Sequence, residues 1–211
     1  MNIVNNFIQV RDKIKSISSV SKLIVVSKNQ NSEDILKLIS NGQLHFGENK
    51  VQETLKKWPE ILQHNKNIKL HFIGKLQSNK AKEAFQIFDY IHSLDNEKLA
   101  KIFSNLEETS NKKINYFIQV NIGEEIQKSG ITISSVNDFV KHCINDLKLN
   151  VLGLMCLPPA NKDPEPFFKK LKALTDDNKL AEISMGMSND YLKAIDCGST
   201  YLRIGSAIFN K

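Results

Sequence analysis

The stretch Leu23-Ile24-Val25-Val26-Ser27-Lys28 decides the fold, because it is a short apolar run that ends abruptly on polar residues. Its apolar residues are consecutive rather than alternating, which is typical of a parallel strand buried on both faces. The run spans 23–27, and seven more of the same kind follow it, at 44–47, 70–74, 90–93, 116–122, 151–157, 181–185 and 201–204. This recurrence predicts repeated βα units.

Segments with helical periodicity lie between these runs. The segment 32–39 begins with the capping residue Ser32 and ends at Asn41-Gly42, and 96–106 places apolar residues at the i, i+3, i+4 spacing of a helix. A further helix is predicted at 3–17, before the first strand. We expect this helix to cap the base of the fold.

Eight strands separated by seven helices, without a linker rich in Pro, Gly or Ser, predict an α/β protein. We expect one domain over residues 1–211, a single-domain (β/α)8 TIM barrel with an extra N-terminal helix. An open doubly wound sheet is the alternative.

Composition excludes several classes of protein. The net charge of +6 comes from lysines scattered over helical faces, without a block of about five like charges, which argues against nucleic acid as a partner. No apolar run reaches the roughly 18 residues of a membrane span. The three cysteines form no C-x-x-C pair, so no zinc or other metal site is predicted, and a reducing cytoplasmic location is expected.

The carboxyl ends of the strands are where a barrel carries its chemistry. Lys28 ends the first strand, where a stiff β-branched run would hold its amine near the barrel axis. An amine so placed is suited to form a Schiff base with an aldehyde. A solvated lysine at a strand end is the structural alternative.

The segments after strands seven and eight read S-M-G-M-S at 184–188 and R-I-G-S at 203–206. Their hydroxyls and glycine-freed backbone N–H groups are suited to cradle a phosphate. Only two of the 29 basic residues are arginines, so Arg203 at the end of a strand is unexpected. A planar, permanently charged donor there could bond an in-plane acceptor, or form a structural ion pair. Together these groups match the aldehyde, phosphate and ring nitrogen of pyridoxal 5′-phosphate (PLP).

The sequence resembles the PLP homeostasis protein family, whose barrel is similar to the N-terminal domain of bacterial alanine racemase. The matching stretches run nearly end to end and include LIVVSK at 23–28, HFGENKVQE at 45–53, HFIGKLQSNK at 71–80, IHSLD at 91–95, SMGMSND at 184–190 and GSTYLRIGSAIF at 198–209. The resemblance implies that Lys28 bears PLP as an aldimine and that Arg203 faces the ring nitrogen. It also implies phosphate ligands at Ser184, Gly205 and Ser206, and pocket-lining residues at Asn49 and Met155. The family usually continues its first motif as S-K-T-K-P, whereas this chain reads Ser27-Lys28-Asn29-Gln30-Asn31, which removes a second lysine that could relay the cofactor.

A carrier is favoured over an enzyme. An arginine at the ring nitrogen keeps that nitrogen unprotonated and makes the ring a poor electron sink. Racemisation also needs a second base, which alanine racemase takes from a separate C-terminal domain that these 211 residues leave no room for. We therefore expect no catalytic residue, and a monomeric protein that buffers PLP and supplies it to PLP-dependent apo-enzymes. A weak racemase or lyase and an RNA-binding module are the alternatives.

Overall fold

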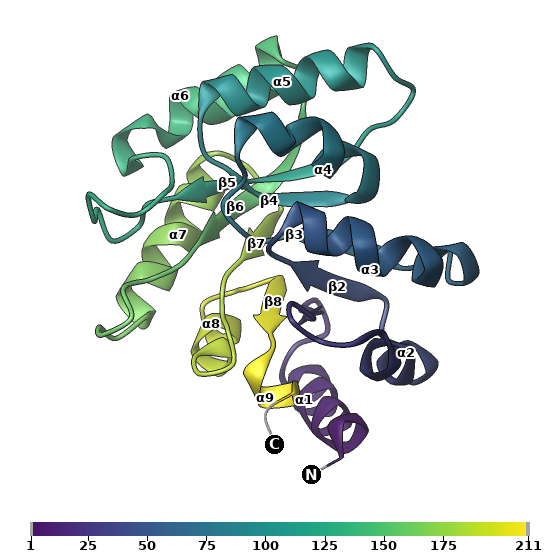
Figure 1. Cartoon of the computed structure of the whole chain (residues 1–211). Helices are drawn as coiled ribbons and strands as arrows, with labels where there is room; N and C mark the ends of the chain where they lie inside the picture. Colours follow the sequence, from purple (N-terminus) through teal and green to yellow (C-terminus); the bar gives the residue numbers. More distant parts are fainter. Residues whose placement is uncertain (1, 210–211) are drawn as a thin grey trace.

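Eight strands pair in chain order, each parallel to the next, and the last pairs with the first (Figure 1). The computed structural model describes residues 2–209, so the ends of the expected domain, residue 1 and residues 210–211, lie outside the described residues. The strands are β1 (Lys22–Val26), β2 (His45–Glu48), β3 (Lys69–Phe72), β4 (Tyr90–Leu94), β5 (Asn115–Val120), β6 (Asn150–Cys156), β7 (Glu182–Ser184) and β8 (Tyr201–Ile204). The predicted (β/α)8 barrel is confirmed, and the open doubly wound sheet is wrong, because β1 and β8 are paired over four residues.

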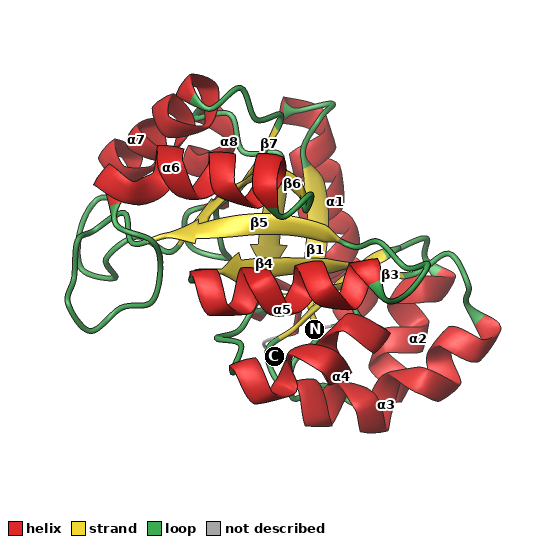
Figure 2. Ribbon diagram, turned by 90° about the horizontal axis from the view of Figure 1, so that it is seen from above, coloured by secondary structure: helices red, strands yellow, loops and turns green. Residues whose placement is uncertain are grey.

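Helices connect consecutive strands and cover the outside of the barrel, as Figure 2 shows. Their bounds are α1 (Ile3–Ile17), α2 (Ser32–Ser40), α3 (Val51–His64), α4 (Ala81–Ile87), α5 (Glu97–Glu108), α6 (Val136–Lys141), α7 (Glu165–Asp177), α8 (Tyr191–Asp196) and α9 (Ser206–Phe209). Asn31, rather than the expected Ser32, caps α2 by accepting a hydrogen bond from the backbone N–H of Asp34 at 2.8 Å. Asparagine suits this position because its side chain satisfies an N–H that the first helical turn leaves free.

The predicted helix at 3–17 is present as α1, but the expectation that it caps the barrel base is wrong. It lies in the outer ring beside α2 and α9 (Figure 1). The Asn6 side chain donates to the Ile208 carbonyl at 3.1 Å, which ties α1 to α9. Phe7, Val10 and Ile14 form a buried stripe along one face of α1. A stripe of this kind suits a helix in the ring or on the base, and the contacts of α1 with α2 and α9 place it in the ring.

The core has two parts. A large apolar cluster fills the space between the strands and the surrounding helices. A much smaller one, built on Ile24, Phe117, Met155 and Tyr201, lies inside the barrel. Barrel interiors are ordinarily packed with branched apolar side chains. The small size of the inner cluster leaves room for polar residues in the interior.

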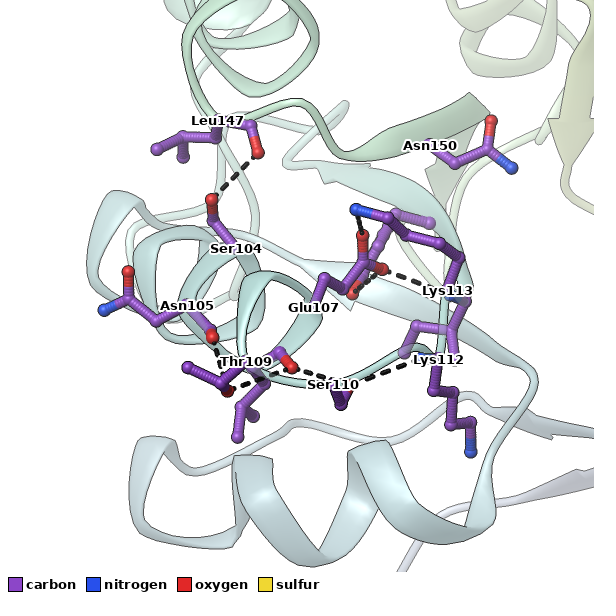
Figure 3. Close-up of polar contacts among 12 residues, drawn as sticks. Ser104, Asn105, Glu107, Thr109, Ser110, Lys112, Lys113, Leu147 and Asn150 are labelled. Carbon is purple, nitrogen blue, oxygen red and sulfur yellow. Dashed lines mark hydrogen bonds and ion pairs between the residues drawn. The ribbon is translucent and has the colours of Figure 1, made fainter.

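A buried carboxylate fastens α5 to β5 at the base of the barrel. Glu107 accepts hydrogen bonds from the backbone N–H of Ile114 at 3.1 Å and the hydroxyl of Tyr116 at 3.0 Å. It also pairs with Lys113 at 2.9 Å. Figure 3 shows Glu107 and Lys113 near Thr109 and Ser110, whose hydroxyls donate to backbone carbonyls at the end of α5. Tyr116 is thus a structural residue, as expected from its place within a strand.

None of the helices among residues 2–209 combines the length and the apolar character that crossing a bilayer requires.

The place of α1 in the ring makes a prediction about stability. Phe7→Ala should lower the free energy of unfolding by roughly 3 to 5 kcal/mol, because Phe7 is fully buried against the main core. Urea denaturation followed by circular dichroism measures this. Gln9→Ala, an exposed site on the same helix, is the matched control. A Phe7→Ala variant as stable as this control would show that α1 is not part of the barrel wall.

Candidate functional site

A cavity of about 910 Å³ opens at the carboxyl ends of the strands. Five of the seven residues predicted to bind a cofactor line it: Lys28, Asn49, Arg203, Gly205 and Ser206. Met155 and Ser184 are not among its lining residues. Four further lysines contribute positive charge to its wall, which favours an anionic ligand: Lys75, Lys128, Lys162 and Lys193.

Lys28 projects from the segment that follows β1 and is exposed on the cavity wall. The chain turns sharply just after it, because Asn29 has a left-handed backbone with φ 60°. Asparagine tolerates this conformation better than most residues. The Lys57 ammonium donates to the carbonyl of Ser27 at 2.8 Å, so the backbone beside Lys28 is held in place.

A buried carboxylate supports the same segment. Glu48 is fully buried, and its Oε1 accepts hydrogen bonds from the Ser27 hydroxyl at 2.7 Å and the Trp58 indole N–H at 2.9 Å. Lys57 completes the group with an ion pair to Glu48 at 2.7 Å. Sequence reasoning missed this support. The sequence offered one indication: Glu48 directly follows an apolar run, and a carboxylate buried there needs a cationic or hydrogen-bonding partner.

Arg203 lies in β8 and is almost completely buried, with part of its side chain on the cavity wall. One guanidinium nitrogen donates to the Ser184 hydroxyl at 2.6 Å and the other to the Cys156 carbonyl at 2.9 Å. Burial lowers the pKa of Arg203 to about 10, so it remains a cation at neutral pH. No carboxylate pairs with it among the ion pairs of residues 2–209, which argues against the structural ion pair considered from the sequence.

Ser184 and Met155 lie beneath the cavity. Ser184 is fully buried and its hydroxyl contacts Arg203 and a ring nitrogen of His92. Met155 packs in the inner apolar cluster. Ser184 thus supports Arg203 from below, and Met155 packs below the site. The sequence could not show this, because both residues belong to strands whose side chains alternate between the barrel interior and the helices.

Ser188, whose hydroxyl belongs to the predicted S-M-G-M-S cradle but which was not named among the cofactor ligands, lines the cavity. Gly186 has φ 93°, and a Cβ there would lie 2.6 Å from the Cβ of Ala194, so glycine is required at the turn that carries the chain from Ser184 to Ser188. The Ser188 hydroxyl accepts a hydrogen bond from the backbone N–H of Ala207 at 3.1 Å. This bond joins the loop after β7 to the segment after β8. In the sequence, Ser188 is recognisable as the second serine of the S-M-G-M-S stretch.

Gly205 and Asn49 complete the wall. A Cβ on Gly205 would lie 3.2 Å from the Cβ of Val26 and 3.3 Å from its carbonyl oxygen, so a side chain would crowd the junction of β1 and β8. The Asn49 Oδ1 atom is buried and has no hydrogen-bond partner among residues 2–209. Buried polar atoms normally find a partner, so this oxygen is available to a ligand. The site thus offers an amine, a fixed cation, a hydroxyl beside a glycine junction, and a free acceptor.

Comparison with known proteins shows relatives along the whole chain. The family described as "Alanine racemase, N-terminal domain" matches residues 2–210. The pyridoxal phosphate homeostasis protein of Pasteurella multocida is 37% identical over 226 residues, with 99% of this chain and 97% of the relative aligned. The protein of that name from Escherichia coli K12 is 32% identical, with 99% and 96% aligned.

Solved structures of similar fold include a PLP-bound protein and a racemase. PipY of Synechococcus elongatus with PLP bound has a TM-score of 0.90 and 28% identity, covering 99% of this chain and all of that one. Alanine racemase of Bartonella henselae has a TM-score of 0.77 and 14% identity, covering all of this chain and 60% of the racemase. The racemase shares the fold.

Removal of the Lys57 charge tests the support beneath Lys28. Lys57→Met should lower the free energy of unfolding by roughly 3 kcal/mol, because it leaves the carboxylate of Glu48 buried without its cation. Lys50→Met is the matched control on the same helix edge, since Lys50 pairs with Glu53 in solvent and should contribute less than about 1 kcal/mol. Chemical denaturation of both variants measures the difference. Equal losses would mean that Lys57 does not support the Lys28 segment.

Proposed function

The chain belongs to the family of pyridoxal phosphate homeostasis proteins, and on that basis we propose that it binds PLP covalently through Lys28. Its role is intracellular vitamin B6 homeostasis: it holds the cofactor and affects amino-acid and keto-acid balance indirectly, without catalysis of its own. The observation that carries this proposal is the placement of Lys28, Arg203 and Ser188 on the wall of one cavity. We propose residues 1–211 as one PLP-binding domain.

The donor set of the cavity fits PLP group by group. When bound, PLP supplies an aldehyde that condenses with a primary amine, and Lys28 presents one on the wall. Arg203 presents a fixed cationic donor to an in-plane ring nitrogen. Ser188, Gly205 and Ser206 form the candidate phosphate cradle, where the glycine lets a ligand approach the backbone. Asn49 offers its unpartnered oxygen to a ring substituent.

Arg203 argues against transamination and decarboxylation. A cation that faces the ring nitrogen keeps the nitrogen unprotonated, because two positive charges would otherwise lie side by side. The ring then withdraws electrons weakly. Arg203 cannot easily yield its proton, since its pKa of about 10 lies well above neutral pH.

The tyrosines also support a carrier. A racemase needs an acid or base on each face of the reacting carbon. None of the tyrosines among residues 2–209 lines the cavity. Tyr116 is bonded to Glu107 at the base of the barrel, and the Tyr201 hydroxyl accepts from Lys22, also at the base.

A weak racemase or lyase remains the second candidate, because the matching family pattern is that of alanine racemase. Exchange of the α-deuterium of common amino acids, followed by NMR with PLP present, distinguishes the two. We expect no exchange approaching the rate of about 1 s⁻¹ at the low end of ordinary enzymes. We propose PLP-dependent apo-enzymes as recipients of the cofactor and a monomer as the working form. Exposure of Lys28 at the cavity mouth supports transfer to a partner.

Covalent trapping tests the role of Lys28. Borohydride reduction of the protein with PLP should fix the cofactor on the peptide that contains Lys28, as detected by mass spectrometry. Lys28→Ala should abolish this label, whereas Lys56→Ala, an exposed lysine on α3, should keep it. A Lys28→Ala protein that is still labelled to the same extent would refute the proposal.

Ser188→Ala tests the phosphate cradle. Loss of a hydrogen bond to a charged group costs about 1.5 kcal/mol or more, so the dissociation constant for PLP should rise roughly tenfold. Binding of pyridoxal, which lacks the phosphate, should be unchanged in the same variant. Absorbance titration measures both constants. Equal weakening of the two ligands, or no weakening of PLP, would place the phosphate elsewhere.

A further inference from the structure

A line of polar side chains crosses the interior of the barrel from its base to Arg203. His45 Nδ1 lies 2.9 Å from His71 Nε2, and His71 Nδ1 lies 2.8 Å from His92 Nε2. His92 Nδ1 lies 2.8 Å from the Ser184 hydroxyl, which accepts a hydrogen bond from Arg203. We call these four residues, His45, His71, His92 and Ser184, the histidine chain.

The three histidines come from consecutive strands, β2, β3 and β4. His71 pairs in register with Gly47, two residues beyond His45, so each histidine stands further along the barrel axis than the one before. This stagger is the shear that closing a sheet into a barrel imposes. A barrel interior filled with branched side chains could not carry such a line. His92 likewise lies two residues beyond Tyr90, the register partner of His71, so the three histidines step from the base toward the mouth on neighbouring strands.

Arg203 fixes the direction of every hydrogen bond in the chain. A guanidinium can only donate, so the Ser184 oxygen accepts from it and has one proton left to give. His92 Nδ1 is the other polar atom in contact with that hydroxyl, so it accepts a hydrogen bond from Ser184; otherwise the buried hydroxyl hydrogen would have no acceptor. A neutral His92 then carries its hydrogen on Nε2 and donates to His71, which in turn donates from Nε2 to His45.

The surroundings keep the His71 and His92 rings neutral and fix their orientation. Burial, and then the charge of Arg203, keep the pKa of His92 well below its usual value. Burial and the neighbouring histidines do the same for the pKa of His71. His92 stacks on Phe117 with ring centroids 4.3 Å apart, and His71 stacks on Tyr90 at 4.1 Å. The stacking holds each ring plane, and a half-turn of either ring would put carbon atoms where its hydrogen-bonding nitrogens lie.

The outer end of the chain meets solvent and charge. His45 is only partly buried, and burial together with Lys22 and Lys69 lowers its pKa, while Asp89 acts in the opposite direction. With His45 neutral, each of the three histidines accepts one hydrogen bond on its Nδ1 atom, starting from Ser184, and none carries a charge. The chain thus links the base of the barrel to the cavity floor without a second charge.

We propose that the histidine chain positions Arg203: its three histidines polarise Ser184, and Ser184 holds the guanidinium in one plane, with the remaining N–H groups toward the cavity. That Arg203 faces the ring nitrogen of PLP rests on the proposed function. The orientation of the Arg203 side chain follows from its own hydrogen bonds and does not depend on that function. His92, His71 and His45 are therefore positioning residues whose effect reaches the cofactor through Ser184 and Arg203.

Nitrogen-15 NMR of histidine-labelled protein, without PLP, tests the chain directly. We expect His71 and His92 to carry hydrogen on Nε2 alone, with no change between about pH 5.5 and pH 8, where a free histidine would change its charge. His64, at the exposed end of α3, is the internal reference. A cationic ring, or hydrogen on Nδ1, at either His71 or His92 would overturn the proposal.

A double-mutant cycle tests the effect on the cofactor. His92→Phe and Ser184→Ala should each weaken PLP binding about tenfold and shift the absorbance band of the complex, because each removes support from a charged donor. The double variant should bind no more weakly than either single variant, since both break one chain. His64→Phe should bind as the unmodified protein does.

A folded His92→Phe protein with unchanged affinity, or losses that multiply in the double variant, would overturn the proposal. If His92→Phe fails to fold, the smaller change Ser184→Ala and the NMR measurement still decide it. Failure of the unmodified protein to bind PLP would refute the proposed function, whereas the NMR result on the histidine chain would stand.

Discussion

The pairing of β1 with β8 is the contact on which the rest of the molecule depends. It closes the barrel, and its register sets Ile24 opposite Arg203. The segments that follow the two strands carry Lys28 on one side and Gly205 on the other, so closure itself brings the amine next to the candidate phosphate cradle. Gly205 suits this position because a Cβ there would crowd Val26. A single pairing thus makes both the fold and the site.

Two buried charged residues, Glu48 and Arg203, support the site, and they differ in how their charges are balanced. Glu48 is balanced by Lys57 and lies behind the wall, where it fastens the segment that carries Lys28. Among residues 2–209 no carboxylate forms an ion pair with Arg203, which donates instead to neutral acceptors, Ser184 and the Cys156 carbonyl. Its full positive charge therefore remains directed at the cavity. The arrangement suits a protein that binds an anionic cofactor with a ring nitrogen and keeps that nitrogen unprotonated, so that the cofactor ring is a weak electron sink.

Much of the fold could be read from the sequence, because parallel strands buried on both faces leave continuous apolar runs. The place of α1 could not, since an amphipathic helix before the first strand has the same pattern in the ring as on the base. Within the site, Lys28 and Arg203 stood out by type and position. The S-M-G-M-S pattern could not show which of its serines lines the cavity, because the turn at Gly186 decides this. The histidine chain was missed because inward and outward positions of a doubly buried strand look alike in sequence, although each of three runs contains a histidine.

The most direct measurement is a crystal structure of the protein grown with PLP. We expect density continuous from Lys28 Nζ to the cofactor, with the phosphate in hydrogen-bond contact with Ser188 and the Gly205-Ser206 segment, and the ring nitrogen facing Arg203. Cofactor attached to another lysine, or its phosphate held by lysines of the cavity rim with Arg203 uninvolved, would contradict the account.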